Sequence, residues 1–153
     1  MKQVLTLSDY EALAELRHQL RLFLGFSEAA ARAAGLEPRQ HQLLLALKGL
    51  PHGKRPLIKE LAERLQIQHH SAVELINRLA AGGYVKRHRG EHDRREVLLL
   101  LTPKGEQVLR KLSLHHQAEL QAQGPALTAA LERIMGGGNG RKNGSNERRR
   151  KSR

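Results

Sequence analysis

The chain of 153 residues contains no cysteine and no tryptophan, and its other aromatics are two Phe and two Tyr. The absence of cysteine excludes disulfides, thiol catalysis, thiol redox sensing and cysteine-ligated zinc. No apolar run approaches membrane-spanning length, and the N-terminus lacks the basic-then-apolar layout of a signal peptide. We therefore expect a soluble, cytoplasmic protein that does not associate with a membrane.

The sequence also lacks the patterns that catalysis requires. It has no nucleophile–base pair, no glycine-rich phosphate loop and no zinc-protease spacing. His115 and His116 are adjacent, so on a helix their side chains would point about 100° apart rather than converge. We expect neither an enzyme nor a cofactor.

Positive charge is in excess, with 27 Lys or Arg against 15 Asp or Glu and a formal net charge of +12. Half of this excess falls after Gly136, where Gly, Asn, Ser and Arg dominate. Such a segment buries too little apolar surface to fold, so residues 136–153 are predicted to form a disordered basic tail. An excess of this size suits a polyanionic partner, whereas charge that serves only solubility is more usually mixed in sign. The tail should add non-specific affinity for such a partner.

The centre of the chain carries two short amphipathic helices. Apolar residues repeat at helical spacing in two groups on either side of Gln66-Ile67-Gln68: Ile58, Leu61, Ala62 and Leu65, then Ala72, Leu75, Ile76 and Leu79. Two helices joined by about three residues form a helix-turn-helix. Residues 84–89 and 96–101 then read as antiparallel strands with Gly90-Glu91-His92 at the tip. A helix-turn-helix followed by a basic hairpin predicts a winged helix that binds DNA.

Longer helices are expected on both sides of this lobe. Ser8 and Glu11 have the spacing of a capping box, and Leu13, Leu16, Leu20 and Phe23 form a narrow apolar seam suited to a subunit interface. Pro38 suits the first turn of a second, buried helix, and Thr102-Pro103 begins the last long one. Gly124-Pro125 is expected to break that helix, with a shorter amphipathic helix after it. The fold class is mainly α with a small β wing.

Five motifs, taken in order, resemble the MarR family of transcriptional regulators. They are Leu61-Ala62-Glu63-Arg64-Leu65, Leu75-Ile76-Asn77-Arg78-Leu79, Gly83-Tyr84-Val85, Asp93-Arg94-Arg95 and Leu101-Thr102-Pro103-Lys104-Gly105. The resemblance covers roughly residues 35–109. It implies a winged-helix domain over 1–135, with a DNA-binding lobe at about 36–101 and dimerisation helices at about 8–34 and 103–135. It also implies a homodimeric repressor on a pseudo-palindromic operator in the nucleoid, released by a small aromatic or phenolic ligand.

Three positions depart from the family pattern. Gln66 stands where the turn often has Gly, which would strain the backbone if that residue is left-handed. Leu57 replaces the common Ser or Thr cap, and Glu74 stands where Lys or Arg is more usual on the exposed face.

The recognition helix is predicted to read base edges in the major groove. If its apolar stripe faces the core, the opposite face and the helix start present Gln68, His69, His70, Ser71, Val73, Glu74 and Asn77. Gln, Asn, His and Ser match the donors and acceptors of base edges, and Val73 suits a thymine methyl group. Glu74 can accept from cytosine but repels phosphate. The alternative for His69 and His70 is surface polarity alone.

The wing supplies a second set of predicted DNA contacts. Asp93 and Arg95, two apart on a strand, are expected to share a face, where the carboxylate would hold the guanidinium extended. The resemblance implies that this arginine enters the minor groove; the alternative is a structural salt bridge without DNA contact. Lys86, Arg87, Arg89 and Arg94 are assigned to phosphate, where contacts position the protein without specifying sequence.

Two alternative functions remain open. Nine scattered histidines could ligate a metal in a metal-responsive regulator of the same fold, although no metal site is assigned. A winged helix can also serve protein or RNA contact, but RNA modules stack bases on aromatic side chains, and the wing offers only Tyr84, expected in the core. His18, Phe23, Phe26 and His41 come from helices that flank the family's ligand pocket, and no effector site is assigned to them.

Overall fold

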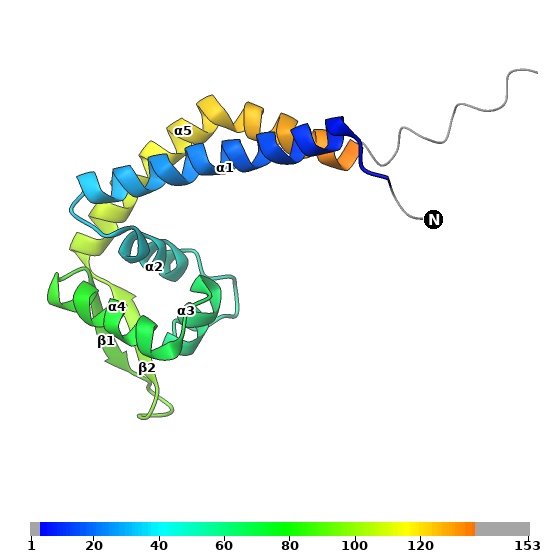
Figure 1. The fold of residues 1–153 in the computed structure, drawn as a ribbon. Helices are drawn as coiled ribbons and strands as arrows, with labels where there is room; N and C mark the ends of the chain where they lie inside the picture. Colours follow the sequence, from blue (N-terminus) through cyan, green and yellow to red (C-terminus); the bar gives the residue numbers. More distant parts are fainter. Residues whose placement is uncertain (1–3, 137–153) are drawn as a thin grey trace, which may run out of the picture. The chain divides into compact units, whose positions relative to one another are not determined.

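A computed structural model describes residues 4–136 of the chain, and Figure 1 shows its elements. In order they are α1 (Leu7–Ala33), α2 (Pro38–Lys48), α3 (Ile58–Leu65), α4 (His69–Ala81), β1 (Val85–Arg89), β2 (Val97–Leu101) and α5 (Pro103–Gly136). The two strands pair antiparallel. The predicted class, mainly α with a small β wing, is confirmed. The predicted basic tail lies outside the described residues, apart from Gly136.

The described residues divide into two compact units, each considered by itself. One unit contains residues 26–117, with the end of α1, the start of α5 and everything between them. The other contains residues 4–25 and 118–136, the outer parts of α1 and α5. The helix-turn-helix and the wing therefore belong to a single unit.

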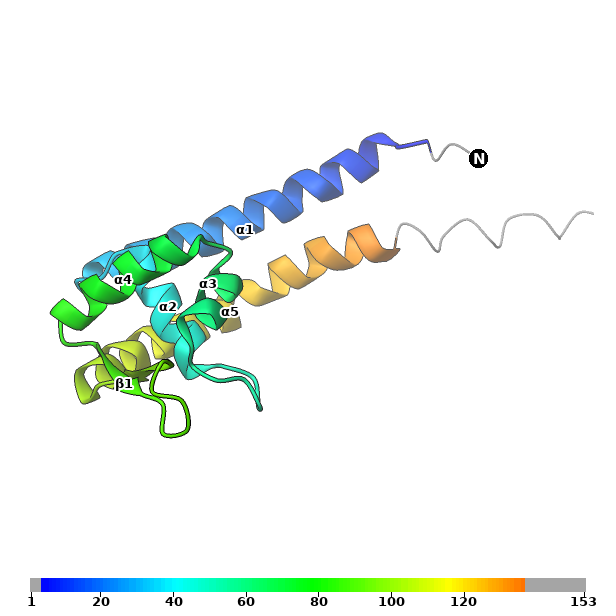
Figure 2. The same cartoon turned by 90° about the horizontal axis from the view of Figure 1, so that it is seen from below.

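The core of the unit spanning residues 26–117 is aliphatic. Within it, α2 packs on α3, α4 and β2, as Figure 2 shows for the helices. The largest fully buried side chains are Leu43, Leu44, Leu61, Ile76, Leu79, Leu99 and Leu112. The predicted apolar stripes of α3 and α4 thus face inward. The expectation of a buried second helix was too broad, because α2 buries His41, Leu43, Leu44 and Leu47 while Leu45 is 48% exposed.

The cap of α1 lies two residues earlier than expected. Asp9 Oδ2 accepts hydrogen bonds of 2.7 Å from both the main-chain N–H and the hydroxyl of Thr6. The Asp9 N–H contacts the Thr6 hydroxyl at 3.4 Å, which completes a reciprocal pair at the helix start. Ser8 is already inside the helix, so the predicted Ser8–Glu11 box is wrong. Thr6 and Asp9 have the same spacing as Ser8 and Glu11, and the Asp9 side chain, although shorter than that of Glu, still reaches the Thr6 N–H.

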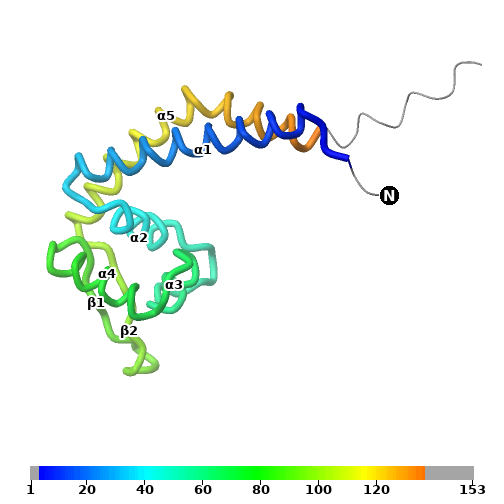
Figure 3. The backbone as a smooth tube through the Cα atoms, viewed as in Figure 1, coloured from blue at the N-terminus to red at the C-terminus, as the bar shows by residue number. Residues whose placement is uncertain are grey.

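The last helix does not break at Gly124-Pro125. It runs unbroken from Pro103 to Gly136 with Pro125 inside it, and the tube in Figure 3 follows one helical path. A helix-interior proline lacks an N–H donor and crowds the carbonyl four residues earlier, at a cost of roughly 3 kcal/mol. The helix nevertheless continues on both sides of Pro125.

Candidate nucleic-acid interface

The turn between α3 and α4 depends on one left-handed residue. Gln66 has φ 55° and ψ 43°, and its N–H donates to the carbonyls of Ala62 and Glu63. The Ile67 N–H also returns to Ala62, at 3.0 Å, so two successive amides close the end of α3. The strain expected at Gln66 is therefore present. Leu57, at the start of α3, makes no side-chain cap, as its identity requires.

The recognition helix α4 buries one stripe and exposes the other. Ala72, Leu75, Ile76 and Leu79 are buried, as predicted. The seven predicted contact residues lie on the rest of the surface: Gln68, His69, His70, Glu74 and Asn77 are exposed, and Ser71 and Val73 are half-buried. Gln68 precedes the helix in an extended conformation and makes no side-chain cap. The first-turn amides of α4 thus have no side-chain acceptor from Gln68.

The strand register of the wing separates its basic residues onto two faces. Arg87 pairs with Leu99, and Lys86 pairs with Leu100. Successive side chains of a strand alternate between faces, so Arg87 and Arg89 share one face while Lys86 and His88 share the other. Lys86 and Leu100 line a surface groove with Lys48 and Lys54. The predicted grouping of Lys86 with the other wing cations is therefore not supported by their placement.

A hydrogen bond joins the wing to the recognition helix. The Arg87 guanidinium on β1 donates to the side-chain carbonyl oxygen of Asn77 on α4. Two residues predicted independently as DNA contacts are thus brought together, and both remain exposed. This contact also identifies the face of the wing that lies toward α4: it is the face carrying Arg87.

Asp93 has a different role from the predicted one. Residues 93–96 form a turn outside both strands, so the alternation assumed for Asp93 and Arg95 does not apply. The Asp93 carboxylate accepts a hydrogen bond from the main-chain N–H of Arg95 at 2.9 Å. The main-chain carbonyl of Asp93 accepts a second one from the N–H of Glu96 at 3.1 Å. This is the local turn that Asp favours. The carboxylate shapes the wing tip, and the Arg95 side chain is exposed beside it.

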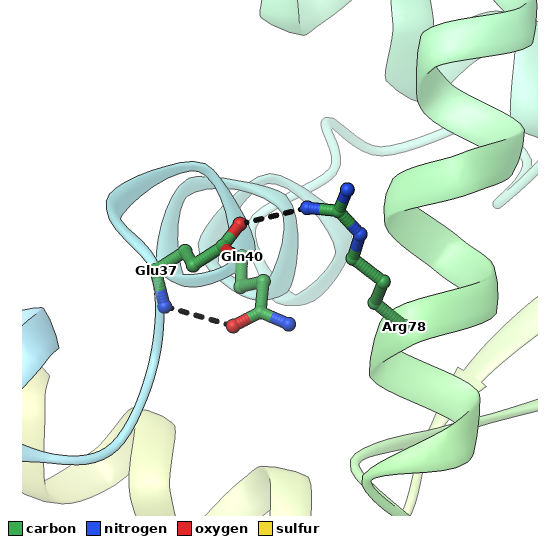
Figure 4. Close-up of polar contacts among 3 residues, drawn as sticks. All are labelled: Glu37, Gln40 and Arg78. Carbon is green, nitrogen blue, oxygen red and sulfur yellow. Dashed lines mark hydrogen bonds and ion pairs between the residues drawn. The ribbon is translucent and has the colours of Figure 1, made fainter.

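Two ion pairs that the sequence did not reveal support this interface. Arg55, before α3, pairs with Glu96 at the base of the wing tip at 2.5 Å. Arg78 on α4 pairs with Glu37 at 3.1 Å, and the Glu37 N–H donates to Gln40 Oε1 at 2.8 Å (Figure 4). Both join residues distant in sequence; the side chains are exposed except that of Glu96, which is half-buried. Of these four residues, only Arg78 lies in one of the five sequence motifs.

Tyr84 lies where the sequence placed it, between wing and core. It is half-buried and packs against the aliphatic cluster. The Lys104 ammonium lies 4.5 Å from its ring centroid and donates to the Gly82 carbonyl at 2.7 Å. Core atoms and a cation thus occupy the surfaces that a stacked base would need.

Histidines do not assemble a metal centre in the described part of the chain. His41 and His116 come together, with ring centroids 4.9 Å apart. Among residues 4–136 no group of three or more His, Cys, Asp or Glu could hold a metal ion. Nor does any helix of that range have the length and apolarity needed to cross a bilayer.

Comparisons with known proteins agree with this geometry. Residues 34–96 match the model of the MarR family. The structure of AbsC, a MarR family transcriptional regulator from Streptomyces coelicolor, superposes with a TM-score of 0.69 at 23% identity over 88% of this chain and 93% of its own. A mutant of S. aureus MepR bound to an oligodeoxyribonucleotide gives 0.64 at 15% identity, covering 84% and 96%. FabT of Streptococcus pneumoniae, in complex with DNA, gives 0.55 at 23% identity, covering 67% and 70%.

A search of curated proteins finds no match. The family model covers the second helix, the helix-turn-helix and the wing up to its tip, and with them four of the five sequence motifs. Residues 34–96 therefore match a MarR family winged-helix segment, and the chain has the fold of the MarR family transcriptional regulators with which it superposes.

Proposed function

We propose that the chain is a homodimeric transcriptional regulator whose two recognition helices bind successive major grooves of an operator. The observation that carries this proposal is the exposed polar face of α4 joined to the basic face of the wing through Asn77 and Arg87. One continuous surface thus offers base-reading groups and phosphate-binding groups together. The DNA complexes among the structural neighbours support the proposal.

Sequence reading is assigned to the start and exposed face of α4. His69, His70 and Gln68 are exposed and carry side chains that pair with base edges. The half-buried Val73 retains enough surface for a thymine methyl group. Glu74 is exposed, and we assign it acceptance from cytosine, because a carboxylate facing phosphate would be repelled.

Asn77 has a narrower role than the sequence suggested. Its carbonyl oxygen already accepts from Arg87, which leaves the amide N–H₂ as its outward donor. A bidentate contact to adenine needs both the donor and the acceptor of the amide. We therefore assign Asn77 to an acceptor on a base edge, such as guanine N7 or thymine O4.

Phosphate and minor-groove contacts are assigned to the wing. Arg87 and Arg89 lie on the face toward α4, and Arg94 and Arg95 are exposed at the tip. Asp93 orders the turn that carries these two arginines through its bond to the Arg95 N–H. A narrow minor groove concentrates negative potential, which favours insertion of Arg95.

Salt dependence tests the wing assignment. If a dimer neutralises on the order of six phosphates, log K should fall against log salt with a slope of about −0.9 per phosphate. Arg95→Ala should weaken binding and make the slope shallower. Arg110→Ala, an exposed arginine on α5, is the matched control and should change neither. An Arg95→Ala protein with unchanged affinity and slope would refute the assignment.

The unit of residues 4–25 and 118–136 supports the homodimer. Ala12 and Ala130 are its buried apolar residues among those described. Its exposed large apolar side chains are Val4, Leu5, Leu7, Tyr10, Leu13, Leu20, Leu22, Leu24, Leu120, Leu131 and Met135. Two helices with this much uncovered apolar surface need a partner, and a second copy supplies a matching one.

Repression and ligand release are the remaining parts of the proposal, and the resemblance to the MarR family supports them. The chain should block transcription from a promoter that contains its selected site. A small aromatic or phenolic ligand should then restore transcription. Activation of that promoter by the protein would contradict the repressor role, and a ligand screen without any release would contradict the effector.

A further inference from the structure

The tip of the wing, residues 90–96, lies beyond both strands of the hairpin. β1 ends at Arg89 and β2 begins at Val97, and Figure 1 shows the loop projecting past them. A two-stranded hairpin is only marginally stable by itself in water. The orientation of the exposed Arg94 and Arg95 therefore depends on what else holds the tip.

Glu96 closes the loop at the tip through its main chain. Its N–H donates to the Asp93 carbonyl at 3.1 Å, and its carbonyl accepts from the Gly90 N–H at 3.0 Å. Gly90 is buried at this turn, and a Cβ built on it would lie 2.7 Å from the Asp93 carbonyl oxygen and 3.3 Å from the Glu96 Cβ. The place of Glu96 thus sets the place of the turn that carries Arg94 and Arg95.

A salt bridge ties Glu96 to the segment before α3. The Glu96 carboxylate lies 2.5 Å from Arg55 Nη1, and the two side chains are 28% and 50% exposed. In the part of the chain that the structure describes, no other hydrogen bond or ion pair joins residues 90–96 to a residue outside the wing. One side-chain contact therefore anchors the tip.

Arg55 itself belongs to a segment that is fixed against the second strand of the wing. The Pro56 carbonyl accepts from the Leu99 N–H at 2.9 Å, and Leu57 forms an antiparallel bridge with Leu98. The helix α3 begins directly after Leu57. Arg55 therefore connects the wing tip to the start of the helix-turn-helix.

The charge of Glu96 by itself opposes DNA binding. A carboxylate beside the exposed arginines of the tip repels phosphate and competes with it for a guanidinium. Ion pairs exposed to solvent also add little to the stability of a fold. A carboxylate that is engaged by Arg55, in contrast, keeps the tip in one orientation in the free protein. Preorganisation of this kind lowers the ordering cost of binding.

We propose that Arg55 and Glu96 are positioning residues, which hold the wing tip so that Arg95 enters the minor groove without further ordering. Asp93 shapes the turn locally through its bond to the Arg95 N–H, and the Arg55–Glu96 salt bridge orients that turn relative to the helix-turn-helix. Loss of either partner frees the tip, and DNA binding then has to order it. This inference rests on the proposed DNA-binding function.

The test compares the affinities of the full chain and two variants for a duplex that the wild type selects from a random pool. Glu96→Ala should bind roughly three- to tenfold more weakly, the cost of ordering one or two side chains on binding. Glu91→Ala removes the same charge from the same tip and is the matched control, because Glu91 is exposed and forms no ion pair among residues 4–136. This control should bind as tightly as the wild type or more tightly.

The sign of the effect separates positioning from a direct contact between Arg55 and phosphate. If Arg55 bound phosphate itself, Glu96→Ala would release the guanidinium and tighten binding. Equal or tighter binding by Glu96→Ala would therefore overturn the inference. Absence of sequence-specific DNA binding by the wild type would instead overturn the proposed function.

A second comparison asks whether Arg95 is the group that the salt bridge positions. In an Arg95→Ala background Glu96→Ala should cause little further loss, because the arginine to be positioned is gone. A loss as large as in the wild-type background would contradict the inference. Thermal unfolding of each variant checks that the fold is retained.

Exchange of the two charges tests the pairing itself. Arg55→Glu should weaken binding, and the addition of Glu96→Arg should restore most of the affinity by forming the pair in reverse. Glu91→Arg adds the same positive charge to the tip of the Arg55→Glu protein without a pairing partner. Equal recovery by Glu91→Arg would show that net charge, and not the salt bridge, controls the affinity, and would overturn the inference.

Discussion

At the residue scale, the strained backbone of Gln66 is the departure from the family pattern with the clearest structural consequence. A left-handed conformation costs a side-chain-bearing residue about 1–2 kcal/mol, and glycine avoids that cost. The resemblance identified Gln66 as a position where glycine is common, but only the structure shows that its φ is 55°.

Gln66→Gly should raise the free energy of unfolding by roughly 0.5–1 kcal/mol, since relief of strain exceeds the extra entropy that glycine loses on folding. Gln68→Gly is the control, because Gln68 has φ −67° and nothing to relieve. Denaturant unfolding of both variants checks the expectation. A stabilisation by Gln68→Gly equal to that of Gln66→Gly would show that strain is not the cause.

The two faces of the wing give a second expectation at this scale. Arg87→Ala should weaken DNA binding and make the salt slope shallower by about 0.9 for each phosphate that the variant no longer neutralises. Lys86→Ala, one residue away on the opposite face, should have the smaller effect. Fluorescence anisotropy over a salt series measures both. Equal effects would mean that both faces of the strand bind DNA.

Asp93 illustrates what residue patterns cannot resolve. Residues that are two positions apart on a strand share a face. The end of a strand, however, is set by the hydrogen bonds of the turn, such as the one from the Gly90 N–H to the Glu96 carbonyl at 3.0 Å. Lys86 was likewise grouped with Arg87 by charge, because charge alone does not reveal the register.

At the element scale, α5 begins against the backbone of the wing. Thr102 Oγ1 donates to the Gly83 carbonyl at 2.5 Å and accepts from the Gly105 N–H at 3.1 Å. A Cβ built on Gly105 would collide with the Tyr84 carbonyl oxygen. The predicted Thr102 cap is thus confirmed, and Gly105 permits the close approach of helix and strand.

Gly105→Ala should lower the free energy of unfolding by about 1–3 kcal/mol or more, because backbone atoms cannot move aside cheaply. Gly25→Ala, in a helical site with nothing within 4 Å, should instead raise it by about 0.5–1 kcal/mol. Thermal or denaturant unfolding measures both. Destabilisation by Gly25→Ala as large as that by Gly105→Ala would contradict this account of the junction.

Helix existence was predictable and helix ends were less so. The apolar periodicities of α3 and α4 predicted both helices and their buried faces, because their period follows directly from packing. Pro125 did not end α5, and Thr6 rather than Ser8 capped α1, because the surrounding structure decides both outcomes and local sequence patterns do not show it. The His41–His116 contact had no local signal, since it joins two distant helices.

At the scale of the whole molecule, the uncovered apolar surface of the outer helices should be closed by a second copy. Leu131→Lys, at a position 43% exposed on α5, should shift the protein from dimer to monomer and weaken operator binding. Leu45→Lys, at a position 48% exposed on α2, is the matched control and should remain dimeric. Sedimentation measures both. A wild-type monomer would refute the dimer.

The central claim is that two recognition helices of one dimer read one DNA site. Selection of bound sequences from a random double-stranded pool, using the full chain, tests it most directly. The enriched site should be a pseudo-palindrome whose half-sites are centred about 34–36 Å apart, one helical turn. Binding without any enriched sequence, or enrichment of a single half-site, would contradict it.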